Sequence, residues 1–138
     1  MGRDEVRKLF ILGMCVFAAG CTMPSYPAKN LVSLGQITQK MSKDEVQARL
    51  GDSVVIGYEI ADEAGTNLKP IKIKNPRRVE IFQRGRRTFE VMFYLTQIRQ
   101  ADDKITDDEL TPLVFENNQL IGQGWQFLNQ ILKSDGSY

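Results

Sequence analysis

Residues 88–98 read TFEVMFYLTQI, the longest strand candidate in the chain. Successive side chains of a strand point to opposite faces of its sheet. One face here carries Phe89, Val91, Phe93 and Leu95. The other carries Met92, Tyr94 and Ile98. Because apolar residues on both faces require cover on both sides, we expect 88–98 to be the central strand of a sheet.

Shorter stretches on both sides of 88–98 also have strand character. Apolar residues that are β-branched or that alternate with polar ones occupy 54–60, 71–74, 79–83 and 110–116. Residues 61–70 are rich in turn formers and predict a loop. The two lysines on 71–74 are typical of an edge strand, where charge discourages further pairing.

The pair Asn117-Asn118 predicts a two-residue hairpin turn, because Asn tolerates positive φ. The turn sets a register in which Glu116 lies opposite Gln119, Phe115 opposite Leu120 and Val114 opposite Ile121. This register places Leu113, Phe115 and Leu120 on one face. After it, Gly122 and Gly124 predict a bend or bulge, and an apolar stripe from Trp125 to Leu132 predicts a short closing helix.

A helix is predicted over 42–50. Ser42 is a suitable N-cap, and Glu45, three residues later, completes the pattern of a capping box. Gly51 suits the left-handed conformation that ends many helices. A weaker apolar stripe over 31–37 indicates another helix just before it.

The N-terminus has the anatomy of a secretory signal: basic residues, a short apolar run over 9–17, and the small residues Ala18-Ala19-Gly20. The run is shorter than the roughly 20 residues that span a bilayer. Cys21 follows directly, and a Cys in this place resembles a bacterial lipobox, where the signal is cut and the Cys is lipidated. A plain secretory signal and an uncut signal anchor are the alternative interpretations.

We therefore expect a lipoprotein signal peptide over 1–20, a tether over 21–36 and a single α+β domain over 37–138. Prolines and small polar residues disfavour a helix at the start of the tether. By resemblance to enterobacterial lipoproteins, Thr22 after the Cys favours the outer membrane, with the domain facing the periplasm.

The composition excludes several kinds of site. The 138 residues include no His, which excludes Ser–His, Cys–His and His-based zinc sites. Of the two Cys, Cys15 lies inside the signal, so the mature chain has no internal disulfide. Acidic and basic residues balance once the signal is removed. We expect no nucleic-acid partner, no cofactor, no metal and no catalytic activity; a glycan hydrolase built on carboxylates is the remaining enzymatic alternative.

A basic segment interrupts this balance between residues 69 and 87, with Glu80 as its one acid. Its bases are Lys69, Lys72, Lys74, Arg77, Arg78, Arg84, Arg86 and Arg87. Because these bases flank strands, they would converge at one end of the sheet and bind anionic lipid, an anionic envelope polymer or an acidic protein partner. The alternative is that they are solvated side chains of loops.

Two further features have a structural interpretation. The acidic residues over 101–109 lack the spacing of a calcium loop and are expected at an exposed hairpin tip. Trp125, with Phe127 close by, is expected in the core rather than in a ligand site.

Residues 37–52, ITQKMSKDEVQARLGD, resemble the opening of the SmpA/OmlA (BamE-like) family of small outer-membrane lipoproteins. In that family a Met-Ser/Thr-x-x-x-Val-x-x-x-x-Gly pattern follows a lipidated, proline-containing tether, and Met41, Ser42, Val46 and Gly51 match it. The resemblance implies an α+β fold with two N-terminal helices packed on an antiparallel sheet of three or more strands, like one repeat of the β-lactamase inhibitor protein.

The same resemblance implies a function in binding. We expect an envelope protein, anchored in the outer membrane by lipid on Cys21, that contacts protein partners such as the barrel-assembly machinery or otherwise maintains the envelope. The alternative is a periplasmic inhibitor or ligand-binding lipoprotein that uses its sheet face.

The lipid anchor is testable at Cys21. Because each buried lipid methylene contributes about 0.8 kcal/mol to membrane binding, several acyl chains anchor a protein stably. Cys21→Ala should therefore move the protein from the membrane pellet to the soluble fraction. Unchanged sedimentation with membranes would rule out the lipid tether.

Overall fold

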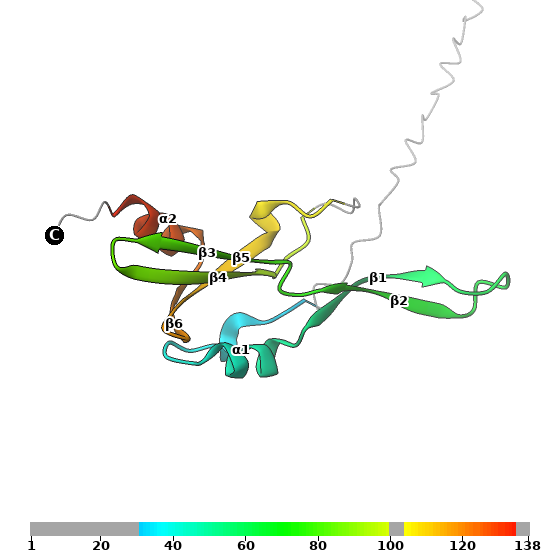
Figure 1. Cartoon of the computed structure of the whole chain (residues 1–138). Coiled ribbons are helices and arrows are strands. Elements are labelled where there is room, and N and C mark those ends of the chain that lie inside the picture. The colour runs from blue at the N-terminus through cyan, green and yellow to red at the C-terminus, as the bar shows by residue number, and fades with distance from the viewer. Residues whose placement is uncertain (1–30, 100–103, 135–138) are drawn as a thin grey trace, which may run out of the picture.

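The computed structural model describes residues 31–99 and 104–134, which are mostly β (Figure 1). A two-stranded antiparallel ribbon consists of β1 (Ser53–Ile60) and β2 (Leu68–Lys74). A four-stranded antiparallel sheet follows in the order β3 (Arg78–Arg84), β4 (Arg87–Leu95), β5 (Leu110–Glu116) and β6 (Gln119–Gln123). The helices are α1 (Lys43–Leu50) and α2 (Trp125–Lys133), with 3-10 turns η2 (Leu34–Gln36) and η3 (Asp107–Glu109).

The predicted fold class is wrong. Instead of two N-terminal helices on one sheet, the described chain has six strands in two antiparallel sheets, with α1 before the strands and α2 at the C-terminal end. The apolar stripe over 31–37 forms only η2, because so short a segment containing Gly35 makes too few helical hydrogen bonds to offset the cost of nucleation. Its apolar side chains pack against the core without a helix.

The helix predicted over 42–50 is confirmed. The Ser42 hydroxyl accepts from the Glu45 N–H at 3.2 Å, and the Glu45 carboxylate accepts from the Ser42 N–H at 2.7 Å. Hydrogen bonds from the Ser42 N–H and the Ser42 hydroxyl to the Glu45 carboxylate lower the pKa of Glu45. Gly51 ends the helix at φ 77°, and Val46 and Leu50 face the core.

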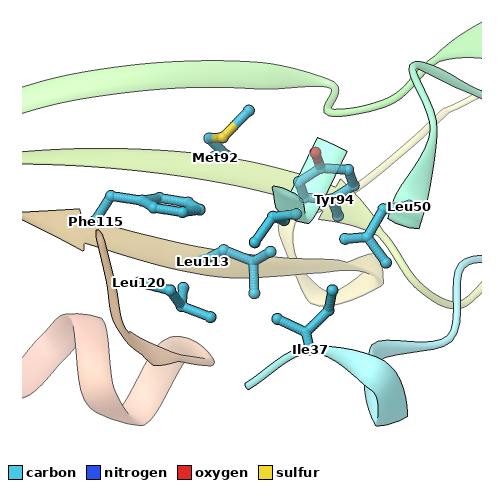
Figure 2. Packing of buried hydrophobic residues seen from close by; sticks show 8 residues of the cluster. Ile37, Leu50, Met92, Tyr94, Leu113, Phe115 and Leu120 are labelled. Carbon is cyan, nitrogen blue, oxygen red and sulfur yellow. The ribbon is translucent and has the colours of Figure 1, made fainter. Parts of the chain in front are cut away.

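Strand β4 is an inner strand buried on both faces, as predicted. One hydrophobic cluster contains Phe89, Val91, Phe93 and Leu95 with Leu128 of α2. The other contains Met92 and Tyr94 with α1 and the predicted group Leu113, Phe115 and Leu120 (Figure 2). Burial raises the pKa of Tyr94 to about 12. Since β4 stops at Leu95, Ile98 lies beyond the strand and packs with Phe93's cluster, contrary to its predicted face.

The Asn117-Asn118 hairpin is also confirmed, with φ of 49° and 63°. Its predicted register holds for the first two pairs and then shifts, so that Val114 lies opposite Gly122. The extra residue forms a bulge, as two nearby glycines suggested. A Cβ on Gly122 would lie 2.4 Å from the Phe127 ring, so α2 packs directly against this backbone.

The loop predicted over 61–70 is too long, because Leu68, Lys69 and Pro70 belong to β2. Pro70 lies opposite Tyr58, and a proline is tolerated there because the two-stranded ribbon consists only of edge strands. The edge position predicted for 71–74 is confirmed.

Asn75 joins the ribbon to the four-stranded sheet. Its side chain is fully buried. Its Oδ1 accepts from the Leu95 N–H at 2.8 Å, and its Nδ2 donates to the Leu95 carbonyl at 3.3 Å. The Asn75 N–H donates to the Asp52 carbonyl at the start of β1. One side chain thus satisfies both backbone groups of the last residue of β4.

Asn75→Ala should lower the free energy of unfolding by about 2 kcal/mol or more, because it leaves the buried N–H and C=O of Leu95 without partners. Urea unfolding followed by tryptophan fluorescence measures the loss. The control is Asn129→Ala on the exposed face of α2, where Ala favours the helix. Equal stability of the two variants would contradict the role given to Asn75.

Candidate interaction surfaces

The structure separates the basic segment instead of gathering it. Lys69, Lys72 and Lys74 lie on β2 of the ribbon, whereas Arg84 and Arg86 lie at the turn between β3 and β4. The first six residues of β3, 78–83, stand between the two groups, roughly 20 Å of extended chain. The expectation that these bases converge at one end of the sheet is therefore wrong.

Arg78 and Arg87 are engaged within the protein. Arg78 Nη1 donates to Asp107 Oδ1 at 2.7 Å, and the guanidinium lies 4.1 Å from the centre of the Phe93 ring. Arg87 forms two 2.6 Å hydrogen bonds to the Glu116 carboxylate across the strands. These bonds lower the pKa of Glu116 and raise that of Arg87. Both guanidinium groups are therefore already bound to carboxylates of the same chain.

The remaining six bases of the segment differ from Arg78 and Arg87 in how they are paired. Lys69 lies 3.4 Å from Glu59 in an exposed ion pair, which contributes little to stability. The other five make no ion pair with any residue in 31–99 or 104–134: Lys72, Lys74, Arg77, Arg84 and Arg86. These five are the predicted surface bases that remain available to a partner.

The ribbon has an exposed apolar face that the sequence patterns do not predict. Tyr58, Ile60 and Leu68 are 52%, 67% and 58% exposed. Tyr58 lies opposite Pro70 and Ile60 opposite Leu68, so the four side chains share one face of the ribbon. We call these four residues the ribbon face. The apolar run in β1 predicts a strand, but it does not show which of its side chains are exposed.

Lys72 and Lys74 continue the ribbon face toward the base of the ribbon, because alternate residues of β2 point the same way. The acids Asp62 and Glu63 lie in the loop at the other end. Hydrogen bonds from Thr66 and Asn67 lower the pKa of Asp62, so this carboxylate stays ionised. In Figure 1 the ribbon extends away from the four-stranded sheet.

The acidic stretch is not simply an exposed tip. Residues 101–103 lie outside the described residues, but Glu109 at its end is only 2% exposed. The Glu109 carboxylate accepts from the N–H groups of Arg99 and Thr106, at 2.6 and 3.0 Å, and thereby closes the loop after β4.

Trp125 is half-buried in the core, as expected. Its Nε1 donates to the Leu110 carbonyl at 2.7 Å, and its ring lies 5.5 Å from that of Phe93.

Cys21 lies outside the described residues. In 31–99 and 104–134 no group of three or more His, Cys, Asp or Glu side chains is placed to hold a metal ion. Within the same ranges, none of the helices has the length and apolar character needed to cross a membrane.

The described chain is thus a mostly β protein with a two-stranded ribbon that carries several exposed apolar side chains. The model of the DUF3192 family, described as a protein of unknown function, matches residues 25–130, and the chain belongs to this family. No curated protein and no solved structure matches the chain.

The pairing of Arg87 with Glu116 predicts a pH dependence. Since the pKa of Glu116 is lower in the folded chain than the usual value of about 4.3, the pair stabilises the fold above that pH. This stability is lost as the pH falls through the lowered pKa. Glu116→Gln should therefore be less stable than wild type at pH 7, and the difference should vanish near pH 2.

Urea midpoints at pH 7, 4 and 2 measure this difference, with Glu63→Gln in the exposed ribbon loop as the control. A difference between wild type and Glu116→Gln that is the same at all three pH values would show that the ion pair is not its cause.

Proposed function

We propose that this protein is a lipid-anchored envelope protein that acts by binding another envelope protein through the ribbon face. The observation that carries the proposal is the exposure of Tyr58, Ile60 and Leu68 on one face of a projecting ribbon. An isolated two-stranded ribbon is marginally stable in water. Grouped apolar side chains on such an element are typical of a surface that a partner covers.

The base of the ribbon is anchored, while its far half is free. Val54 is buried in the cluster around Phe93, and Ile56 and Ile73 pack against that cluster. Beyond them, every residue of β1 and β2 from Tyr58 and Ile71 outward is exposed. The ribbon thus presents the ribbon face on a fixed base at a distance from the sheet, as a binding element requires.

The charges around the ribbon face indicate the chemistry of the partner. Lys72 and Lys74 have no ion pair among the described residues and lie on the same side as the ribbon face. A complementary partner would present an apolar patch bordered by carboxylates. A protein suits this better than a bilayer, because inserting the ribbon into lipid would carry the ionised Asp62 toward the hydrocarbon.

The sequence supports the envelope location through the signal-like N-terminus and Cys21. The resemblance to the SmpA/OmlA family supports the barrel-assembly machinery as the partner to test first. The alternative of an inhibitor that uses the sheet face has less support, because the inner strands β4 and β5 of the four-stranded sheet are buried on both faces.

The test is crosslinked co-purification of the lipidated protein from its own membranes. Ile60→Ser with Leu68→Ser should reduce recovery of barrel-assembly components at least about tenfold, because both side chains are central to the ribbon face. The variant should fold, since both side chains are exposed. Leu132→Ser, at an exposed position on α2, is the apolar control.

A second pair of variants tests the charges. Lys72→Glu with Lys74→Glu should reduce recovery, whereas Arg77→Glu with Arg86→Glu changes the net charge equally and should not. Equal recovery with wild type and with both ribbon variants would refute binding through the ribbon. Recovery of a soluble enzyme in place of barrel-assembly components would favour the inhibitor function.

A further inference from the structure

The four-stranded sheet has one covered edge and one open edge. Residues 40–42 pair with the first residues of β6: the Lys40 N–H donates to the Leu120 carbonyl and the Leu120 N–H donates to the Met41 carbonyl, both at 2.8 Å. At the opposite edge, no described residue pairs with the outer side of β3. An unpaired edge strand is a template for a further strand.

One face of β3 is apolar and exposed beside this edge. Val79 and Ile81 are 47% and 69% exposed and lie on the same face. Strand β3 contains no proline, and its pairing with β4 shows no register shift. It therefore lacks two of the common devices that prevent edge-to-edge association.

The charges on the other face of β3 are unbalanced within one molecule. Arg84 lies opposite Arg87, whose guanidinium is already bound to Glu116. Arg84 has no carboxylate partner among the described residues. Glu80 lies four residues earlier on the same face, with Phe82 between them. Its Oε1 lies 2.9 Å from Arg78 Nε, but the Glu80 side chain is still 56% exposed and can contact a second molecule.

We propose that two copies of this chain associate through antiparallel pairing of their β3 strands, centred on Phe82. In this register Glu80 lies opposite Arg84 of the second copy, and Arg84 lies opposite Glu80 of the second copy. Phe82 lies beside its own equivalent, and the two sheets become one eight-stranded sheet. Each opposite-charge and aromatic cross-strand pair stabilises such an arrangement.

The neighbouring registers are less favourable. Centring the pair on Ile81 would place Arg78 opposite Arg84 of the second copy, and centring it on Glu80 would place two carboxylates together. Like charges directly opposite each other destabilise a strand pair. Only the register centred on Phe82 supplies the acid that Arg84 lacks.

Aromatic packing favours the same register. Phe82 stacks on Phe89 of the adjacent strand with ring centroids 5.3 Å apart. The association would extend this pair into a row of four aromatic rings across the joined sheets. The overlap spans only residues 80–84, so the dimer is weak in solution and is favoured where a lipid anchor concentrates the protein on a membrane.

Charge exchange tests the register. Full-length lipidated protein is examined by sedimentation equilibrium in density-matched detergent. Glu80→Arg and Arg84→Glu should each lower the association constant about tenfold, because each creates two like-charge contacts by symmetry. The double variant E80R/R84E should restore it to near the wild-type value. Lys133→Glu in the last turn of α2, an exposed position, is the control and should not change association.

Cysteine pairing gives an independent readout. Ile81 and Gln83 of two copies lie opposite each other in this register, with Cα atoms about 5 Å apart, a distance that a disulfide spans. A mixture of the Ile81→Cys and Gln83→Cys proteins should therefore crosslink on oxidation, while either protein alone should not. The cysteine variants keep Glu80 and Arg84, so this readout does not depend on the stability of the charge variants.

A wild-type protein that stays monomeric at the highest concentration reached would overturn the proposal, as would crosslinking of Ile81→Cys alone. A double charge variant that remains as weak as the single variants, without the mixed crosslink, would also overturn it. None of these experiments changes the ribbon face. A negative result would therefore refute the β3 dimer without contradicting the proposed envelope function, which the co-purification experiment tests.

Discussion

The buried amide of Asn75 determines how the parts of this protein are joined. Its side chain satisfies both the N–H and the C=O of Leu95, the last residue of β4. Its own N–H binds the carbonyl of Asp52, so the same residue holds the start of β1. A buried backbone group without a partner costs about 1–3 kcal/mol, and an amide that serves several such groups constrains the chain strongly. The ribbon therefore leaves the sheet from one fixed point.

The division of charge follows from this geometry. Bases near the sheet find acids on neighbouring strands or loops, as Arg87 does with Glu116 and Arg78 with Asp107. Lys72 and Lys74 lie on a ribbon with few acids, and Arg84 faces another base at the open edge. In the part of the chain that the structure describes, the ribbon and the β3 edge each combine exposed apolar side chains with bases that make no ion pair, and our two proposals rest on these places.

Sequence patterns predicted the bases of the candidate site but not their arrangement. They indicated the excess of positive charge between residues 69 and 87, because composition is readable directly. They placed these bases together, whereas β3 holds Arg84 far from Lys72. They also predicted a strand that includes Tyr58 and Ile60, but they did not predict that this end of the strand is exposed. An alternating or apolar run predicts a strand, but burial depends on segments distant in the chain.

What the sequence by itself determined are the features set by neighbours within a few residues. The capping box of Ser42 and Glu45, the Asn117-Asn118 turn and the two-faced strand around Val91 belong to this group, because short-range hydrogen bonds and the two-residue period of a strand govern them. Tertiary structure alone decided the shifted register at Gly122, where the Phe127 ring occupies the space of a side chain. Tertiary structure also decided the division into two sheets. This division depends on the buried side chain of Asn75, which binds the backbone of Leu95 twenty residues later in the chain.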